Sequence, residues 1–190
     1  MTYKIIDNLP IDYEFSTKSK KELKLYENWF WENKEKRISE LSQSVISTKG
    51  YENWVPDFTS NSLKELGAWL KQNTETEKIP EAEYKKKRME IPDYIKLNDW
   101  DLTIKTRSLL VDTGIYLGEV FIHTYPQLKW EQYFSTRKED NNQGHMVIDV
   151  GKKFLNPIWV MYIIGLGLAD NSENEHCLSN ILGIWSKYVK

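Results

Sequence analysis

The sequence predicts an α+β fold that is mainly helical, with a small antiparallel sheet in the C-terminal half. Several long segments repeat apolar residues with the 3.6-residue period of a helix. A short stretch, 128–134, instead alternates apolar and polar residues as a half-buried strand does, and residues 145–150 are its expected partner strand. The chain has 190 residues. This length predicts that residues 1–190 form a single domain with one core.

The first predicted helix begins at Ser19, and Glu22 follows three residues later. This spacing is typical of a capping box, in which the hydroxyl and the carboxylate each bond a backbone N–H group at the start of the helix. Apolar residues then recur at helical spacing as far as Val45. Residues 1–50 could therefore form a helical N-terminal arm on the main domain.

A second capping box, Ser62 with Glu65, precedes a short leucine-rich segment and predicts a short helix. The chain then turns polar, and prolines at 80 and 92 interrupt it. We interpret 72–98 as a polar linker or loop with room for one helical piece.

The third predicted helix covers residues 102–123, which contain no proline and are apolar on most faces. A helix of this kind lies at the centre of a fold. Gly114 and Gly118 lie four residues apart within it. They lower the helical propensity but allow another element to approach closely.

The strands at 128–134 and 145–150 are predicted to pair through a polar turn at 138–144. Asn156 followed by Pro157 predicts the start of a helix that ends near Leu168, because proline is favoured at the first helical position. A third capping box, Ser172 with Glu175, predicts the terminal helix.

Composition excludes several classes of protein. The 26 basic and 28 acidic residues are evenly spread, with a net charge of −2, so we expect no nucleic-acid partner. The apolar run 158–169 is too short to cross a bilayer of about 30 Å, so we expect no membrane association. The single cysteine, Cys177, excludes an internal disulfide framework and a multi-cysteine zinc site. The chain begins without a secretory-signal pattern, and we expect a cytoplasmic protein.

The sequence contains no phosphate-binding glycine loop, nucleophile elbow or His-Glu-x-x-His motif. We therefore assign no catalytic residue, metal site or cofactor, and we lean against an enzyme. One polar stripe on the third helix stands out, because its members are spaced to share one face. They are Ser108, Asp112, Tyr116, Glu119 and His123.

Three interpretations of this stripe remain open. It could face solvent. It could form a structural network in which Glu119 pairs with a helix end, with Arg107 or with the backbone. It could instead line a cleft in which one carboxylate binds a partner or a metal; a metal site would need further ligands.

Aromatic residues make up 13% of the chain, including eight Trp. Most fit the apolar faces of predicted elements, but Trp29, Trp31, Tyr51, Trp54 and Trp100 do not. Trp and Tyr are frequent anchors of protein interfaces. Of these five residues, Trp29, Trp31 and Trp54 are therefore candidate partner-binding residues.

Residues 112–122, with Tyr116, Gly118 and Glu119, and then Leu128-Lys-Trp130, form a helix-then-strand pattern. The pattern resembles small bacterial α+β proteins of the immunity-protein type, which are encoded beside toxins. The resemblance implies a role in partner binding for Tyr116, Glu119 and Trp130. It implies no catalytic residue.

The leading hypothesis is a non-enzymatic bacterial binding protein, an immunity protein that neutralises a cognate toxin by occlusion. A second hypothesis is an enzyme or small-ligand-binding protein with a cleft beside Asp112, Glu119 and His123. A third is a structural or regulatory homodimer, and the sequence leaves the oligomeric state open. The residues expected to bind a protein partner are Asp112, Tyr116, Glu119, Trp130, Trp29, Trp31 and Trp54.

Overall fold

The computed structural model describes residues 3–95, 97–137, 140–151 and 153–190. Within these ranges the chain is mainly helical and has two small antiparallel sheets, which confirms the predicted α+β class. The helices are α1 (Lys20–Ile46), α2 (Ser60–Asn73), α3 (Glu81–Glu90), α4 (Ile104–Thr124), α5 (Pro157–Ala169) and α6 (Cys177–Ser186), with a 3-10 turn at Phe15–Thr17. The strands are β1 (Thr76–Lys78), β2 (Trp100–Leu102), β3 (Trp130–Gln132), β4 (Met146–Asp149) and β5 (Phe154–Leu155).

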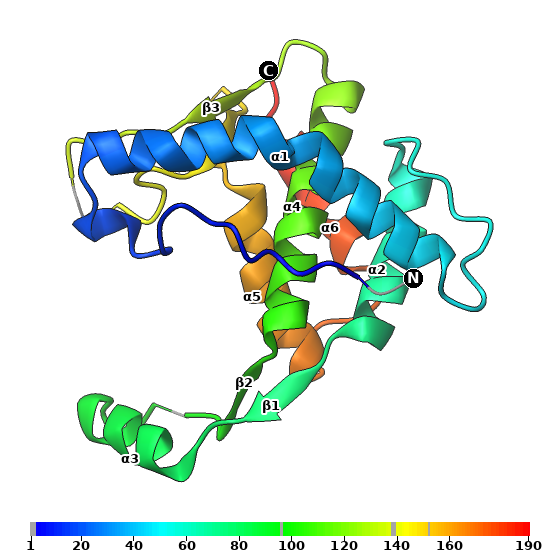
Figure 1. Ribbon diagram of the computed structural model, residues 1–190. Helices are drawn as coiled ribbons and strands as arrows, with labels where there is room; N and C mark the ends of the chain where they lie inside the picture. Colours follow the sequence, from blue (N-terminus) through cyan, green and yellow to red (C-terminus); the bar gives the residue numbers. More distant parts are fainter. Residues whose placement is uncertain (1–2, 96, 138–139, 152) are drawn as a thin grey trace.

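Helix α4 occupies the centre of the molecule, as its sequence predicts (Figure 1). Every residue from Ser108 to Phe121 is buried. Helix α1 crosses α4 on one side, α5 packs along it, and α2 packs against both α4 and α6. A helix that is surrounded in this way has no solvent-facing side, which explains its apolar composition.

Two glycines set how closely other elements approach α4. A Cβ atom at Gly114 would lie 2.7 Å from the Cα of Ile158, so the first turn of α5 rests directly on the α4 backbone. At Gly118 a Cβ atom would lie 1.9 Å from the indole ring of Trp130. The close approach expected from the sequence therefore exists at both positions.

The N-terminal region belongs to the core. Ser19 and Glu22 form the expected capping box, and α1 continues without a break to Ile46. Its side chains Tyr26 and Phe30 are fully buried. The extended segment before α1 runs across α4 (Figure 1). Over residues 3–46, the N-terminal region that the sequence allowed as a helical arm packs on the main domain, because α1 uses its apolar face to cover α4.

The segment 72–98 is ordered where a polar linker was expected; residue 96 lies outside the described residues. It contains the end of α2, strand β1 and helix α3. Strands β1 and β2 pair antiparallel, Thr76 opposite Leu102, and carry α3 away from the body (Figure 1). Salt bridges from Lys85 to Glu81 and from Lys87 to Glu83 support α3 at the i, i+4 spacing that favours helices.

The sheet in the C-terminal half has the order β3-β4-β5. Trp130 pairs with Ile148, and Ile148 pairs with Leu155. Both predicted strands are confirmed, while β5 was not predicted because two residues show no periodicity. Of the predicted turn 138–144, residues 138–139 lie outside the described part of the chain.

Helix α5 begins as predicted, with the Asn156 side chain accepting the N–H of Trp159 and proline at its first position. Two predicted capping boxes are wrong. Helix α2 is capped by Thr59, which accepts from the N–H of Ser62, so Ser62 itself lies inside the helix. Helix α6 begins only at Cys177. Its N-cap residue, His176, makes no side-chain capping bond.

We expect Gly118→Ala to destabilise the protein by about 2–4 kcal/mol, because the new methyl group overlaps the buried Trp130 ring. Gly183 in α6 is the matched control, since a Cβ there meets nothing within 4 Å. Gly183→Ala should stabilise by about 0.5–1 kcal/mol through helix propensity. Urea denaturation measures both variants, and equal effects would contradict the close packing at Gly118.

Candidate functional site

The polar stripe on α4 lies inside the protein. Ser108, Asp112, Tyr116 and Glu119 are buried, Asp112 and Tyr116 completely, whereas His123 at the end of the helix is exposed. The solvent-facing interpretation therefore does not hold for the four buried members. Their partners decide between a structural network and a cleft.

Asp112 forms a bidentate ion pair with Arg37 of α1. The Arg37 Nε and Nη2 atoms donate to the two carboxylate oxygens at 2.8 and 2.7 Å, and the Tyr3 hydroxyl donates at 2.6 Å. Burial raises the pKa of Asp112 to about 6, while Arg37 and Tyr3 oppose that shift. At neutral pH the carboxylate is thus ionised, and both of its oxygens have hydrogen-bond donors.

Glu119 is held by two other elements. Lys34 of α1 and the indole N–H of Trp130 in β3 donate to the same oxygen at 2.8 and 2.7 Å. Arg107, one of the partners expected from the sequence, pairs instead with Asp101 at 2.7 Å. Both partners come from outside α4, because α4 presents this side chain towards α1 and β3 together. Lys34 supplies the counter-charge, and Trp130 supplies a neutral donor.

The remaining members of the stripe bind the segment that leads into α2. The Tyr116 hydroxyl lies 2.7 Å from the Ser62 hydroxyl and accepts the N–H of Phe58 at 3.1 Å. The Phe58 ring stacks on His123 at 4.3 Å. Ser108 accepts the backbone N–H of Ile6. Their partners come from the N-terminal segment and from the residues before and within α2, so the stripe is a structural network.

The second hypothesis required a cleft beside Asp112, Glu119 and His123. The three pockets that we describe are lined by other residues, and only one of them includes a partner of the stripe, Arg37. Both carboxylates are committed to ion pairs with α1. This arrangement does not favour acid–base chemistry at the stripe.

The aromatic residues selected from the sequence occupy two environments. Trp29, Trp54 and Trp130 are buried, and their indole N–H groups donate to Asn8, to the Ser62 carbonyl and to Glu119. Trp31 alone of the selected tryptophans is largely exposed, at 47%. The buried three lie in the core, so in this conformation they present no surface to a partner.

Metal and thiol chemistry find no support in the described residues. No three His, Cys, Asp or Glu side chains within them converge on a point where a metal ion could bind. Burial raises the pKa of the Cys177 thiol to about 11, which disfavours a nucleophilic thiolate. No described helix has both the length and the apolar character needed to cross a membrane.

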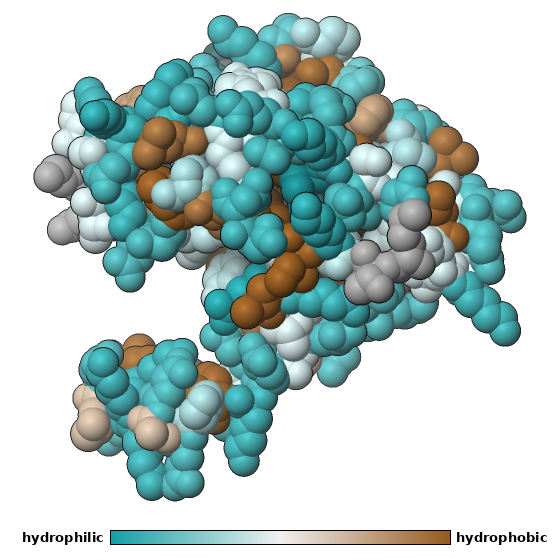
Figure 2. Space-filling view, viewed as in Figure 1, coloured by the Kyte–Doolittle hydropathy of each residue, from teal (hydrophilic) through white to brown (hydrophobic). Residues whose placement is uncertain are grey.

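One candidate surface is the arm formed by β1, β2 and α3. Figure 2 shows α3 as a lobe set apart from the body, with hydrophobic patches among polar ones. Helix α3 has no buried residue. Met89 is 82% exposed and Tyr94, in the turn that follows, is 88% exposed. Arg88 holds this turn by donating to the carbonyls of Ile91, Pro92 and Ile95.

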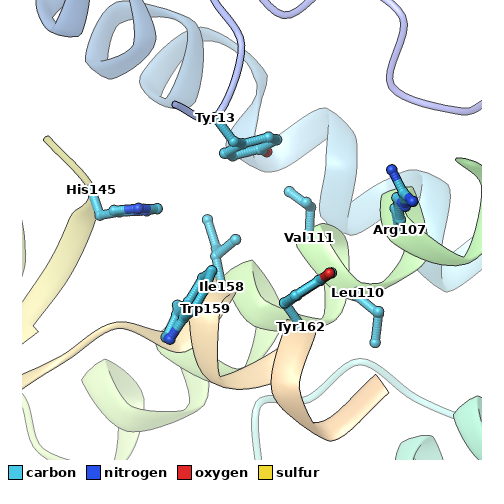
Figure 3. Close-up of a pocket in the computed structure, with 8 residues that line it drawn as sticks. All are labelled: Tyr13, Arg107, Leu110, Val111, His145, Ile158, Trp159 and Tyr162. Atoms are coloured by element: carbon cyan, nitrogen blue, oxygen red, sulfur yellow. The ribbon is translucent and has the colours of Figure 1, made fainter. Parts of the chain in front are cut away.

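The other candidate is an aromatic groove on the body. A pocket of about 370 Å³ lies between the N-terminal segment, α4 and α5. Tyr13 lies opposite Trp159 and Tyr162, with His145 and Arg107 at the two ends (Figure 3). A second pocket of about 410 Å³ shares Tyr13, His145 and Trp159, so the two pockets adjoin, and together we call them the groove.

His145 is the unusual polar group of this groove. It is 8% exposed, and its Nδ1 atom has no hydrogen-bond partner among the described residues. Burial lowers the pKa of His145 from 6.5 to about 4. The imidazole is therefore neutral at pH 7. A buried polar atom without a partner is uncommon in folded proteins and marks a site worth explaining.

Sequence reasoning missed both surfaces. Tyr13, His145 and Trp159 lie far apart in the chain, and no local pattern connects them. The arm did carry a signal, since Met89 and Tyr94 interrupt a strongly polar stretch. Apolar side chains in a segment that cannot bury them indicate an interaction surface.

Comparison with protein-family models, with curated proteins and with solved structures gave no match to this chain.

We expect Arg37→Met and Asp112→Leu each to destabilise the protein by about 3–5 kcal/mol, because each leaves the other charge buried and unpaired. The double variant should lose less free energy of unfolding than the two single variants lose together. Glu81→Gln, which breaks the exposed pair with Lys85, is the control and should leave the free energy of unfolding unchanged. Additive losses in the double-variant cycle would contradict the pairing.

The low pKa of His145 predicts a pH dependence of stability. Between pH 6.5 and 4 the unfolded chain binds a proton at this residue that the folded chain excludes, so stability falls as the pH falls. From pH 7 to pH 4, the free energy of unfolding of the native protein should fall by about 3 kcal/mol more than that of His145→Phe. Urea denaturation at both pH values measures this difference. Parallel pH profiles of the two proteins would show that His145 is not buried in the neutral form.

Proposed function

We propose that this chain is a non-enzymatic binding protein that grips a protein partner with the α3 arm. The observation that carries the proposal is that α3 buries none of its residues. Isolated helices shorter than about 12–15 residues are marginally stable in water, and α3 has ten residues. Because no core stabilises it, we infer that a partner packs against it.

The side chains of the arm suit a protein interface. Met89 adapts its shape to irregular surfaces, and Tyr94 provides a large rigid anchor with a polar tip. Charged residues of both signs surround them on α3, as in the polar rim of an interface. An exposed apolar centre with a charged rim favours a protein over a nucleic acid or a lipid.

The partner that we propose is a bacterial toxin, neutralised by occlusion. This part of the proposal rests on the resemblance of residues 112–122 and 128–130 to immunity proteins, together with the commitment of both stripe carboxylates to ion pairs. An inhibitor of this kind needs a rigid body that presents a projecting element, and needs no catalytic group. The arm on the α4-centred body meets that requirement.

The test is co-expression with the product of the adjacent gene, followed by co-purification, calorimetry and growth rescue. Met89→Ala combined with Tyr94→Ala should weaken binding at least tenfold, because truncated interface anchors cost about 2 kcal/mol or more. The free energy of unfolding should not change, since both side chains are exposed. Val55→Ala, an exposed apolar residue outside the arm, is the matched control and should bind normally.

Two results would contradict the proposal. Growth rescue by the double variant at the level of the native protein would exclude the arm as the binding surface. Failure of the adjacent gene product to bind the native protein would exclude it as the toxin, and capture of no protein by the immobilised native chain would exclude the binding function itself.

A further inference from the structure

We propose that the groove beside His145 is a site for a small planar aromatic molecule that carries a carboxylate. The groove lies on the body, and none of the residues that line its two pockets belongs to the α3 arm. The inference therefore goes beyond partner binding by the arm. It rests on the shape of the groove, the placement of its donors and the unpartnered atom of His145.

The walls of the groove favour a flat ring. Trp159 stacks on Tyr162 with their ring centroids 5.6 Å apart, and across the groove Tyr13 stacks on Phe15 at 5.5 Å (Figure 3 shows Tyr13, Trp159 and Tyr162). Leu110, Val111 and Ile158 complete an apolar lining. An aromatic ligand between such walls gains offset-stacked and edge contacts.

The polar groups of the groove favour an anion at one end. Arg107 lines the pocket, and its Nη2 atom pairs with Asp101 at 2.7 Å. A guanidinium has five N–H donors, so others remain for a ligand. Asp140 lines the opposite end beyond His145 and repels a carboxylate there. A carboxylate is thus directed to the Arg107 end.

His145 supplies the second polar contact. Its Nδ1 atom is buried without a partner, and Figure 3 shows the imidazole extending into the pocket. A neutral imidazole offers one donor and one acceptor nitrogen. Nδ1 itself has almost no accessible surface, so a ligand substituent reaches it when the imidazole turns towards the pocket, and the bond then removes the penalty of an unsatisfied buried polar atom. Apolar walls with a few convergent polar groups, in a pocket of about 370 Å³, are typical of small-molecule sites.

The experiment titrates the full chain with naphthoate and follows the NMR signals of its histidines and tryptophans. We expect saturable shifts of His145 and Trp159 with a dissociation constant of about 1 mM or below. His123 and His176, which lie outside the groove, are internal controls and should not shift. Naphthalenemethanol lacks the charge and cyclohexanecarboxylate lacks the flat ring, so each should bind at least tenfold more weakly.

Three variants separate the contributions. Trp159→Leu removes a wall and should weaken naphthoate binding at least tenfold, while Trp31→Leu, at a tryptophan of similar exposure outside the groove, should not change it. Arg107→Gln should abolish the preference for naphthoate over naphthalenemethanol. The double variant of Met89 and Tyr94 should bind naphthoate normally, so the two proposals fail separately.

The proposal is overturned if naphthoate at millimolar concentration leaves the His145 signal unshifted. It is also overturned if Trp159→Leu and Trp31→Leu bind naphthoate equally well. Binding of naphthylmethylamine in preference to naphthoate would show that the groove selects a cation, which contradicts the role given to Arg107.

Discussion

The arrangement of this protein depends on the buried ion pair between Arg37 and Asp112. A carboxylate with no exposed surface is tolerated only when it is paired and fully hydrogen-bonded. Arg37 comes from α1 and the third partner, Tyr3, from the N-terminal segment. Removal of either element from α4 would leave a charge in an apolar interior. The pair therefore fixes both elements in one position, a specificity that apolar packing alone does not provide.

The other members of the stripe extend the same principle along α4. Glu119 joins α1 to β3 through Lys34 and Trp130, and Tyr116 joins the segment around Phe58 and Ser62. The Trp130 ring lies directly against Gly118, and in this position its N–H group reaches Glu119. A larger residue at position 118 would displace the ring and with it the hydrogen bond. The buried polar residues of the stripe, which the sequence marked as candidate site residues, thereby hold four segments on α4: the N-terminal segment, α1, β3 and the segment around Phe58 and Ser62.

The surfaces left for function are those that the core does not use. The α3 arm exposes Met89 and Tyr94, and the groove exposes aromatic rings around His145. They differ in character, since the arm projects from the body and the groove is recessed within it. A convex apolar surface suits a protein partner, and a concave one with convergent polar groups suits a small molecule.

The sequence by itself determined the class of fold, the central position of α4, the start of α1 at Ser19 and the two main strands of the C-terminal sheet. These features follow from periodicity and capping, which act over a few residues. Only the tertiary structure decided that Asp112 and Glu119 are structural, that Trp29 and Trp54 are buried, and that Tyr13 and His145 line the same pocket. Their partners lie on other elements, and the burial of a side chain depends on how those elements pack. A local pattern places a residue on a face of a helix, but only packing decides what covers that face.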